Sequence, residues 1–325
     1  MRPLMTTAVG SYPKPKYILE ARSKVARGQM SRQELEVLEK QATKEWIQFQ
    51  EEIGLDIMVD GEQYRGDMVT YFAENLQGFA ISGLVRSYGN RYYRKPIAIG
   101  PIRRKGSITL GMFLYTQSLT QRPVKGMLTG PYTICDWSFN DYFKSREEFV
   151  MEIAQVVHQE ALDLERAGAQ YIQIDEPAVS TRPDEIDLAI KAMGVATQGL
   201  KATTITHICY GDFNTAYPRL LDMPVDILDL EMANSNYDML ELFKRHPFTK
   251  ILTVGVVDVH NHAIESVAQV KEGIYHTLEV VPPERLLVDA DCGLKTRTVE
   301  EAKAKLRVMQ QAVKEVKREL NLEGD

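Results

Sequence analysis

Eight short, strongly apolar segments recur along the chain, and most of them are separated by segments with helical character. They occupy residues 6–10, 55–62, 125–131, 171–177, 203–209, 226–232, 251–257 and 286–293. Most are continuously apolar and end in a polar residue, which is typical of parallel strands buried on both faces. Eight strand–helix repeats predict an α/β fold, a single (β/α)8 barrel domain over residues 1–325. The alternative is an open doubly wound sheet, which favours a glycine-rich turn after its first strand, and VGSYPKP is not such a turn.

Local signals mark where several helices begin and end. The Ser-x-x-Glu sequences at 31–34 and 145–148 match the capping box, in which each side chain satisfies a free amide at a helix start. Gly54 and Gly168 are placed to end these two helices. A last helix, amphipathic and rich in Lys and Glu, is predicted over 299–320.

Residues 66–123 interrupt the alternation, because they are too long for one crossover between the second and third strands. They contain a predicted short helix at 68–76, an aromatic and basic run, RSYGNRYYRKP, at 86–96, and a strand-like segment, SITLGMFLY, at 107–115. We interpret this stretch as an insertion over the barrel mouth, in the form of a hairpin or a small subdomain.

Charge and cysteine content exclude several classes of protein. The net charge is −6 with both signs interspersed, so no basic stripe for nucleic acid is present. The apolar runs are far shorter than a membrane span, and the N-terminus lacks the apolar core of a secretion signal. Three scattered cysteines are too few for a disulfide framework, which predicts a cytoplasmic location. Cys135 is interpreted as a small buried apolar residue.

Three of the predicted strands end in residues that bind soft divalent metals. His207 and Cys209 lie two apart on one strand and therefore share a face, Glu231 ends the next strand, and Cys292 ends the last. In a barrel, residues at the carboxyl ends of strands face the same mouth. Each residue alone has an equally good structural explanation, but an imidazole, two thiols and a carboxylate together predict zinc. At a barrel mouth, such a zinc site favours activation of a small-molecule thiol for attack on an alkyl group.

Long blocks of the sequence resemble the catalytic C-terminal half of cobalamin-independent methionine synthase, which methylates homocysteine. The blocks are VGSYP (9–13), DGEQYRGDMVTYF (60–72), LTGPYTICDWSF (128–139), IQIDEPA (172–178), HICYGDF (207–213), LEMANS (230–235), VGVVDVHN (254–261) and DADCGLKTR (289–297). The resemblance implies that His207, Cys209, Glu231 and Cys292 bind Zn²⁺.

The resemblance also implies a binding site for the amino acid homocysteine. Its residues would be Val9, Gly10, Ser11, Glu62 and Asp175. Two carboxylates suit the ammonium group of an amino acid, and backbone amides suit its carboxylate. The alternative for Asp175 and its neighbour Glu176 is a pair of hydrogen-bonding residues behind the substrate.

Further roles follow from the same resemblance. His260 would be the acid/base residue, although on its own a loop-capping histidine would be the better interpretation. Trp137 would stack on the flat ring system of a folate, and Arg91 and Tyr92 align with residues near that folate.

Two departures from the family pattern bear on the methyl donor. We expect the second, N-terminal barrel of full-length members to be absent, and Thr181 stands where the family has a glutamate that holds the pterin. Threonine cannot supply that negative charge. We therefore expect a short methionine synthase whose donor is methylcobalamin on a corrinoid protein. The alternatives are methyltetrahydrofolate as the donor, coenzyme M as the acceptor, and a non-catalytic protein that binds zinc or a methyl carrier.

Overall fold

The chain divides into two compact units in the computed structural model, which describes residues 1–86, 92–209, 211 and 213–322. The first unit comprises Met1–Tyr64, Met112–Lys125 and Leu228–Asp325, and the second comprises Arg65–Gly111 and Gly126–Ile227. The assignment of residues 1–325 to one domain stays a prediction.

A seven-stranded sheet contains most of the predicted strands, in the order β1-β10-β9-β8-β7-β6-β4. β1 pairs in parallel with β10, β10 with β9, and β6 with β7. The strands are β1 (Met5–Thr6), β4 (Lys125–Thr129), β6 (Tyr171–Asp175), β7 (Thr203–Ile208), β8 (Ile227–Leu230), β9 (Ile251–Gly255) and β10 (Leu286–Asp289).

The segment predicted as the second strand, residues 55–62, lies between β1 and β4, the two strands at the ends of this order. The Ile57 amide donates to the Thr6 carbonyl at 3.0 Å, and the Lys125 amide donates to the Met58 carbonyl at 2.9 Å. Met58 also forms an isolated parallel bridge with Val124. The segment therefore lies between β1 and the start of β4, and the strands follow one another as in a (β/α)8 barrel. The predicted fold class is confirmed, although the first strand is only Met5–Thr6 rather than residues 6–10.

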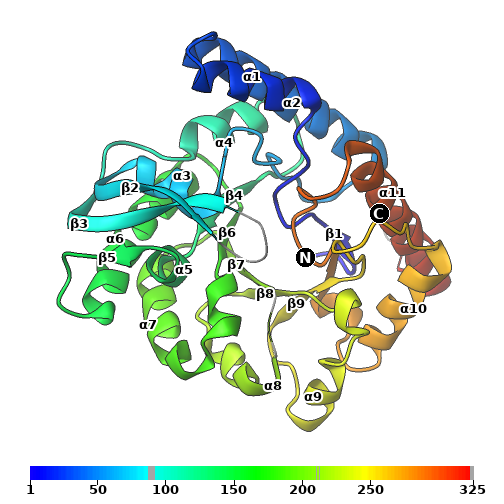
Figure 1. Cartoon of the computed structure of the whole chain (residues 1–325). Coiled ribbons are helices and arrows are strands. Elements are labelled where there is room, and N and C mark those ends of the chain that lie inside the picture. Colours follow the sequence, from blue (N-terminus) through cyan, green and yellow to red (C-terminus); the bar gives the residue numbers. More distant parts are fainter. Residues whose placement is uncertain (87–91, 210, 212, 323–325) are drawn as a thin grey trace. The chain divides into compact units, whose positions relative to one another are not determined.

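Helices follow most of the strands along the chain (Figure 1). The α-helices are α1 (Lys16–Ala26), α2 (Arg32–Ile53), α3 (Met68–Glu74), α4 (Leu110–Gln117), α5 (Pro131–Asp136), α6 (Arg146–Arg166), α7 (Ile186–Thr197), α8 (Phe213–Ala216), α9 (Leu240–Arg245), α10 (Val267–Leu278) and α11 (Val299–Glu319). Short 3-10 helices are η1 (Pro177–Thr181), η2 (Pro183–Glu185), η3 (Arg219–Asp222), η4 (Ala233–Ser235) and η5 (Pro283–Arg285). Among the described residues, no helix is both long enough and apolar enough to cross a membrane.

The predicted helix signals are largely confirmed. Ser31 and Glu34 form the complete capping box of α2, and Gly54 ends that helix in the left-handed conformation with φ of 86°. Ser145 Oγ accepts the Glu148 amide at 3.1 Å, as predicted for α6. The Glu148 carboxylate, however, accepts from the Lys144 amide rather than from Ser145, so only half of the second box forms.

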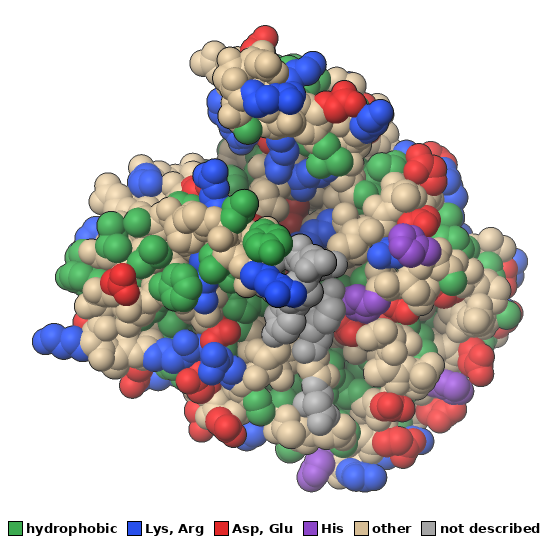
Figure 2. Space-filling view, viewed as in Figure 1, with side chains coloured by type: hydrophobic (Ala, Val, Ile, Leu, Met, Phe, Trp, Pro, Cys, Tyr) green, Lys and Arg blue, Asp and Glu red, His purple; other side chains and the backbone are tan. Residues whose placement is uncertain are grey.

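Residues 66–111 of the insertion belong to the second unit and contain a long hairpin, whereas residues 112–123 belong to the first unit. β2 (Leu76–Arg86) and β3 (Tyr92–Arg104) pair antiparallel, and β3 pairs with β5 (Phe139–Asn140). Hydrophobic side chains gather over this sheet (Figure 2), where Leu84 and Ile99 are exposed. Part of the basic run, residues 87–91, lies outside the described residues.

The prediction of a strand at 107–115 is wrong, because Leu110–Gln117 forms α4. The buried Glu160 carboxylate accepts the amides of Ile108 and Thr109 at 2.9 and 2.7 Å, and that of Leu110 at 3.3 Å. This distant side chain caps the helix start, and a sequence pattern within 107–115 cannot reveal it.

Candidate metal centre and acid–base site

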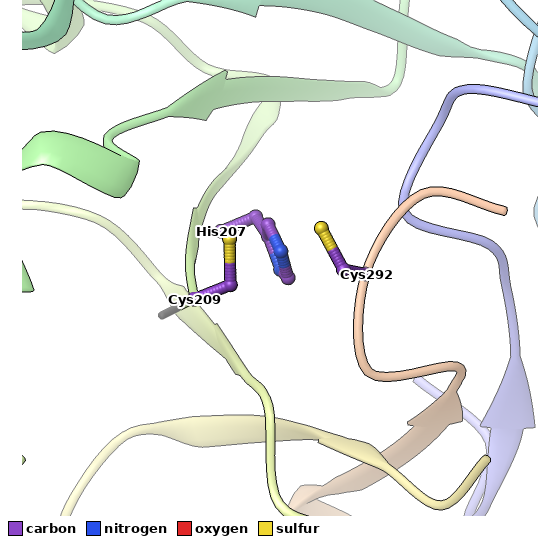
Figure 3. Close-up of side chains that lie close together, drawn as sticks. All are labelled: His207, Cys209 and Cys292. Carbon is purple, nitrogen blue, oxygen red and sulfur yellow. The ribbon is translucent and has the colours of Figure 1, made fainter. Parts of the chain in front are cut away.

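Three of the four predicted metal ligands lie together. One ligand atom each from His207, Cys209 and Cys292 lies within 4.8 Å of the other two. Figure 3 shows the His207 ring and the two sulfur atoms pointing toward one another. His207 belongs to β7, Cys209 follows that strand directly, and Cys292 follows β10. One imidazole and two thiols at this spacing match the ligand set of a catalytic zinc site, which keeps a further position open.

Glu231, the fourth predicted ligand, is held by other groups of the first unit. Its Oε2 lies 3.2 Å from His260 Nε2, and its Oε1 accepts from Asn234 Nδ2 at 3.0 Å. The side chain is buried at the end of β8. Its role as a metal ligand therefore stays a prediction.

Backbone contacts within the second unit fix the His207 strand end. The Glu176 amide donates to the His207 carbonyl at 3.0 Å, and Ser180 Oγ donates to the Cys209 carbonyl at 2.8 Å. The buried Glu176 carboxylate accepts the amides of Tyr132 and Thr133 at 2.9 and 2.8 Å. Burial raises the pKa of Glu176 to about 7, whereas these hydrogen bonds lower it. Glu176 therefore holds the start of α5, and a contact between Asp175 and the substrate stays a prediction.

Asp291, the residue before Cys292, holds the turn after Glu231. Its buried carboxylate accepts the amides of Met232, Ala233 and Asn234 at 2.9, 2.8 and 2.6 Å. Burial raises the pKa of Asp291 to about 7, opposed by the three amides. A carboxylate in such a nest ties the Cys292 loop to the turn that carries Glu231. Asp291 and Asn234 were not among the predicted site residues, although they lie near Cys292 and Glu231 in the chain.

His260 lies in the loop after β9 and is partly exposed, with 24% of its side chain accessible. Its hydrogen bond to Glu231 raises the pKa of His260 above the usual value, while burial lowers it. The His260 amide donates to Asp258 Oδ1 at 2.7 Å, which fixes the backbone of the loop. A hydrogen-bonded, solvent-accessible imidazole of this kind can store and release a proton.

The residues predicted to bind homocysteine in the first unit form a closely packed turn. Val9 and Gly10 are buried, and a Cβ added to Gly293 would lie 2.0 Å from Ser11 Oγ, so the loop after Cys292 touches Ser11. Glu62 has φ of 53°, a left-handed conformation that is uncommon outside glycine and often marks a functional site.

The predicted substrate residues of the second unit are Asp175 and Trp137. Asp175 ends β6, and its Oδ1 accepts from Gln173 Nε2 at 2.7 Å. Trp137 follows α5 and is partly exposed. Of the residues aligned with the folate site, Tyr92 is exposed on β3 and Arg91 lies outside the described residues. Cys135 is buried as predicted, and burial raises the pKa of its thiol to about 12.

A comparison with known protein families shows to which family this chain is related. Residues 4–315 match the family described as "Cobalamin-independent synthase, Catalytic domain". The chain belongs to this family. It is accordingly an enzyme of the methyltransferase class.

Named relatives agree with the family match. The methionine synthase of Saccharolobus solfataricus is 37% identical over 322 residues, covering 99% of this chain and 97% of the relative. A B12-independent methionine synthase from Shewanella sp. W3-18-1, solved in complex with selenomethionine, superposes with a TM-score of 0.88 at 30% identity, covering 98% of this chain and 99% of that chain.

A longer relative bears on the methyl donor. The 5-methyltetrahydropteroyltriglutamate–homocysteine methyltransferase of Thermotoga petrophila is 39% identical over 328 residues, which is 97% of this chain but only 45% of that protein. The prediction of a corrinoid methyl donor is wrong for this family, because the family is described as cobalamin-independent and this member is named for a pterin donor. That prediction rested partly on Thr181, whose hydroxyl donates to the Ala178 carbonyl at 2.9 Å.

Proposed function

We propose that the chain makes methionine by transferring a methyl group from a methyltetrahydropteroyl glutamate to the sulfur of homocysteine. The observation that carries this proposal is the grouping of His207, Cys209 and Cys292 within 4.8 Å, in a chain of the methionine synthase family. Zinc is the ion that this ligand set fits best, and Glu231 is the proposed fourth ligand. When bound, zinc would keep the sulfur of homocysteine as a thiolate at neutral pH.

Residues of the chain would hold the acceptor amino acid. We propose that Glu62 and Asp175 bind its ammonium group and that the turn Val9–Ser11 binds its carboxylate, through backbone amides and the Ser11 hydroxyl. The left-handed conformation of Glu62 presets its position before any substrate arrives. The Shewanella relative supports an amino-acid site of this kind, since it was solved with selenomethionine.

His260 would handle the proton of the reaction. The sulfur of homocysteine attacks the methyl carbon, the sulfur–carbon bond forms, and the nitrogen–carbon bond of the donor breaks with its electron pair left on nitrogen. The thiol proton must leave, and the donor nitrogen must gain one. We assign the proton delivery to His260, because its pKa lies above the usual value and its ring is partly accessible.

Trp137 would stack on the pterin ring of the donor. The test compares donors directly: purified, zinc-loaded protein is incubated with homocysteine and with methyltetrahydropteroyl monoglutamate, the triglutamate, or methylcobalamin, and methionine is measured. We expect turnover with the pterin donors. Replacing Trp137 with alanine should raise KM for the donor about tenfold or more, since base-type stacking contributes about 1–3 kcal/mol.

The control for this variant is Tyr142→Ala, which removes an exposed aromatic ring of the same unit. Its KM should equal that of the parent protein. Methionine formed only with methylcobalamin, or with none of the donors, would refute the proposal. A reducing, cytoplasmic location stays a prediction that agrees with thiol ligands.

A further inference from the structure

A lysine ammonium is buried against the loop that carries His260. Lys305 lies on α11 and its side chain is fully buried. Its Nζ donates to both oxygens of Glu265, at 3.0 and 2.9 Å, and to the Ala263 carbonyl. An ammonium has three protons, so these contacts use its whole donor capacity on one short segment.

Glu265 connects this ammonium to the backbone next to His260. Its Oε1, which Lys305 binds, also accepts the Asp258 amide at 3.0 Å. Asp258 Oδ1 in turn accepts the His260 amide at 2.7 Å. The same Asp258 carboxylate accepts from the Asn261 side chain through Oδ2. A continuous set of hydrogen bonds therefore runs from α11 to the backbone of His260, entirely within the first unit.

We propose that Lys305 and Glu265 are positioning residues for His260: the buried ion pair holds the 257–266 loop so that the imidazole stays beside Glu231. This inference rests on the proposed function, and its evidence is the hydrogen-bond geometry of the loop. The ring itself contacts a different carboxylate, with 3.2 Å between Glu231 Oε2 and His260 Nε2. The loop backbone is thus held through Glu265 and Asp258, and the ring is held through Glu231.

A fully buried ammonium is unfavourable unless it is paired and hydrogen-bonded, and apolar side chains could join a helix to a loop more cheaply. Here the ammonium binds both oxygens of Glu265 and the Ala263 carbonyl, so its three donors hold this segment in one arrangement. Small displacements of an acid/base group lower the rate much more than they lower the stability of the fold.

The test removes the ammonium by Lys305→Met. Hydrogen exchange of the zinc-loaded protein is followed by mass spectrometry, and kcat, KM for homocysteine and zinc content are measured. We expect faster exchange in the peptide covering 257–266 and unchanged exchange in the sheet. The kcat should fall about tenfold, as for a misplaced catalytic group, with KM and zinc content unchanged.

The matched control is Lys271→Met, which removes an ammonium that bridges α10 and α11. Lys271 pairs with Glu315 and Glu319, at 3.2 and 2.5 Å, and not with the 257–266 loop. In the Lys271→Met variant, hydrogen exchange in the 257–266 loop and kcat should equal those of the parent protein. Should Lys305→Met fold poorly, the double variant Lys305→Met/Glu265→Leu replaces it, because it leaves no buried charge unpaired.

Three results would overturn the proposal: unchanged exchange in 257–266, faster exchange throughout the protein with kcat lost in proportion to unfolding, or a mobile loop with parental kcat. An inactive parent protein refutes the proposed function instead, and this is known before any variant is made.

Discussion

Replacing Cys292 with serine is expected to remove both zinc binding and methionine synthesis. The alcohol of serine stays protonated at neutral pH and is a poor zinc ligand, whereas a thiol binds as the thiolate. Zinc affinity should fall on the order of 10²-fold or more, because one of a few ligands is lost from a site whose total binding energy is large. Methyl transfer to homocysteine should fall with it. The measurement is zinc content after dialysis against a chelator of known affinity, together with methionine formation.

Cys135 supplies the control for this variant. It is buried and does not belong to the grouping of His207, Cys209 and Cys292. Cys135→Ala should keep full zinc content and activity at moderate temperature. A Cys292→Ser protein that holds zinc as tightly as its parent would show that Cys292 is not a ligand.

Replacing His260 with glutamine is expected to lower kcat on the order of 10²- to 10⁴-fold, the usual contribution of a positioned acid or base. Glutamine keeps a hydrogen-bond donor for Glu231 but cannot release a proton near neutral pH. Zinc content and KM for homocysteine should stay close to those of the parent. Steady-state kinetics with the pterin donor measure the effect.

His262 offers a matched histidine two residues along the same loop. It is exposed and pairs with Glu301 at 2.9 Å. The His262→Gln variant should retain parental kcat, so a general effect of loop substitution can be separated from proton transfer. If both variants lose activity equally, or if His260→Gln keeps it, His260 is not the acid of this reaction.

The fold was predictable because strand position and helix caps are local signals. Continuous apolar runs marked the strands, and Ser31 with Glu34 marked a helix start that the structure reproduces in full. The wrong strand prediction concerns a segment whose structure depends on a contact with a residue distant in the sequence. Residues 107–115 have the apolar, β-prone composition of a strand, but the Glu160 carboxylate caps them from a distant helix and makes Leu110–Gln117 helical. No pattern within 107–115 contains that information.

The candidate site was partly predictable for the same reason. His207, Cys209 and Cys292 stood out because each occupies a strand end and carries metal-binding chemistry. Asn234, Asp291 and Lys305 could not be found in this way, since an amide, a carboxylate or an ammonium in a loop or helix is usually at the surface. Their roles depend on hydrogen bonds to Glu231, its following turn and Glu265, which only a structure reveals.

X-ray absorption at the zinc edge tests the central claim most directly, because it counts the sulfur atoms bound to the metal. The zinc-loaded protein is measured alone and after addition of homocysteine. The grouping of His207, Cys209 and Cys292 predicts two zinc–sulfur contacts before addition. Activation of the homocysteine thiol predicts that this number rises by one, at about 2.3 Å. An unchanged sulfur count at saturating homocysteine, in protein that makes methionine, would contradict the account.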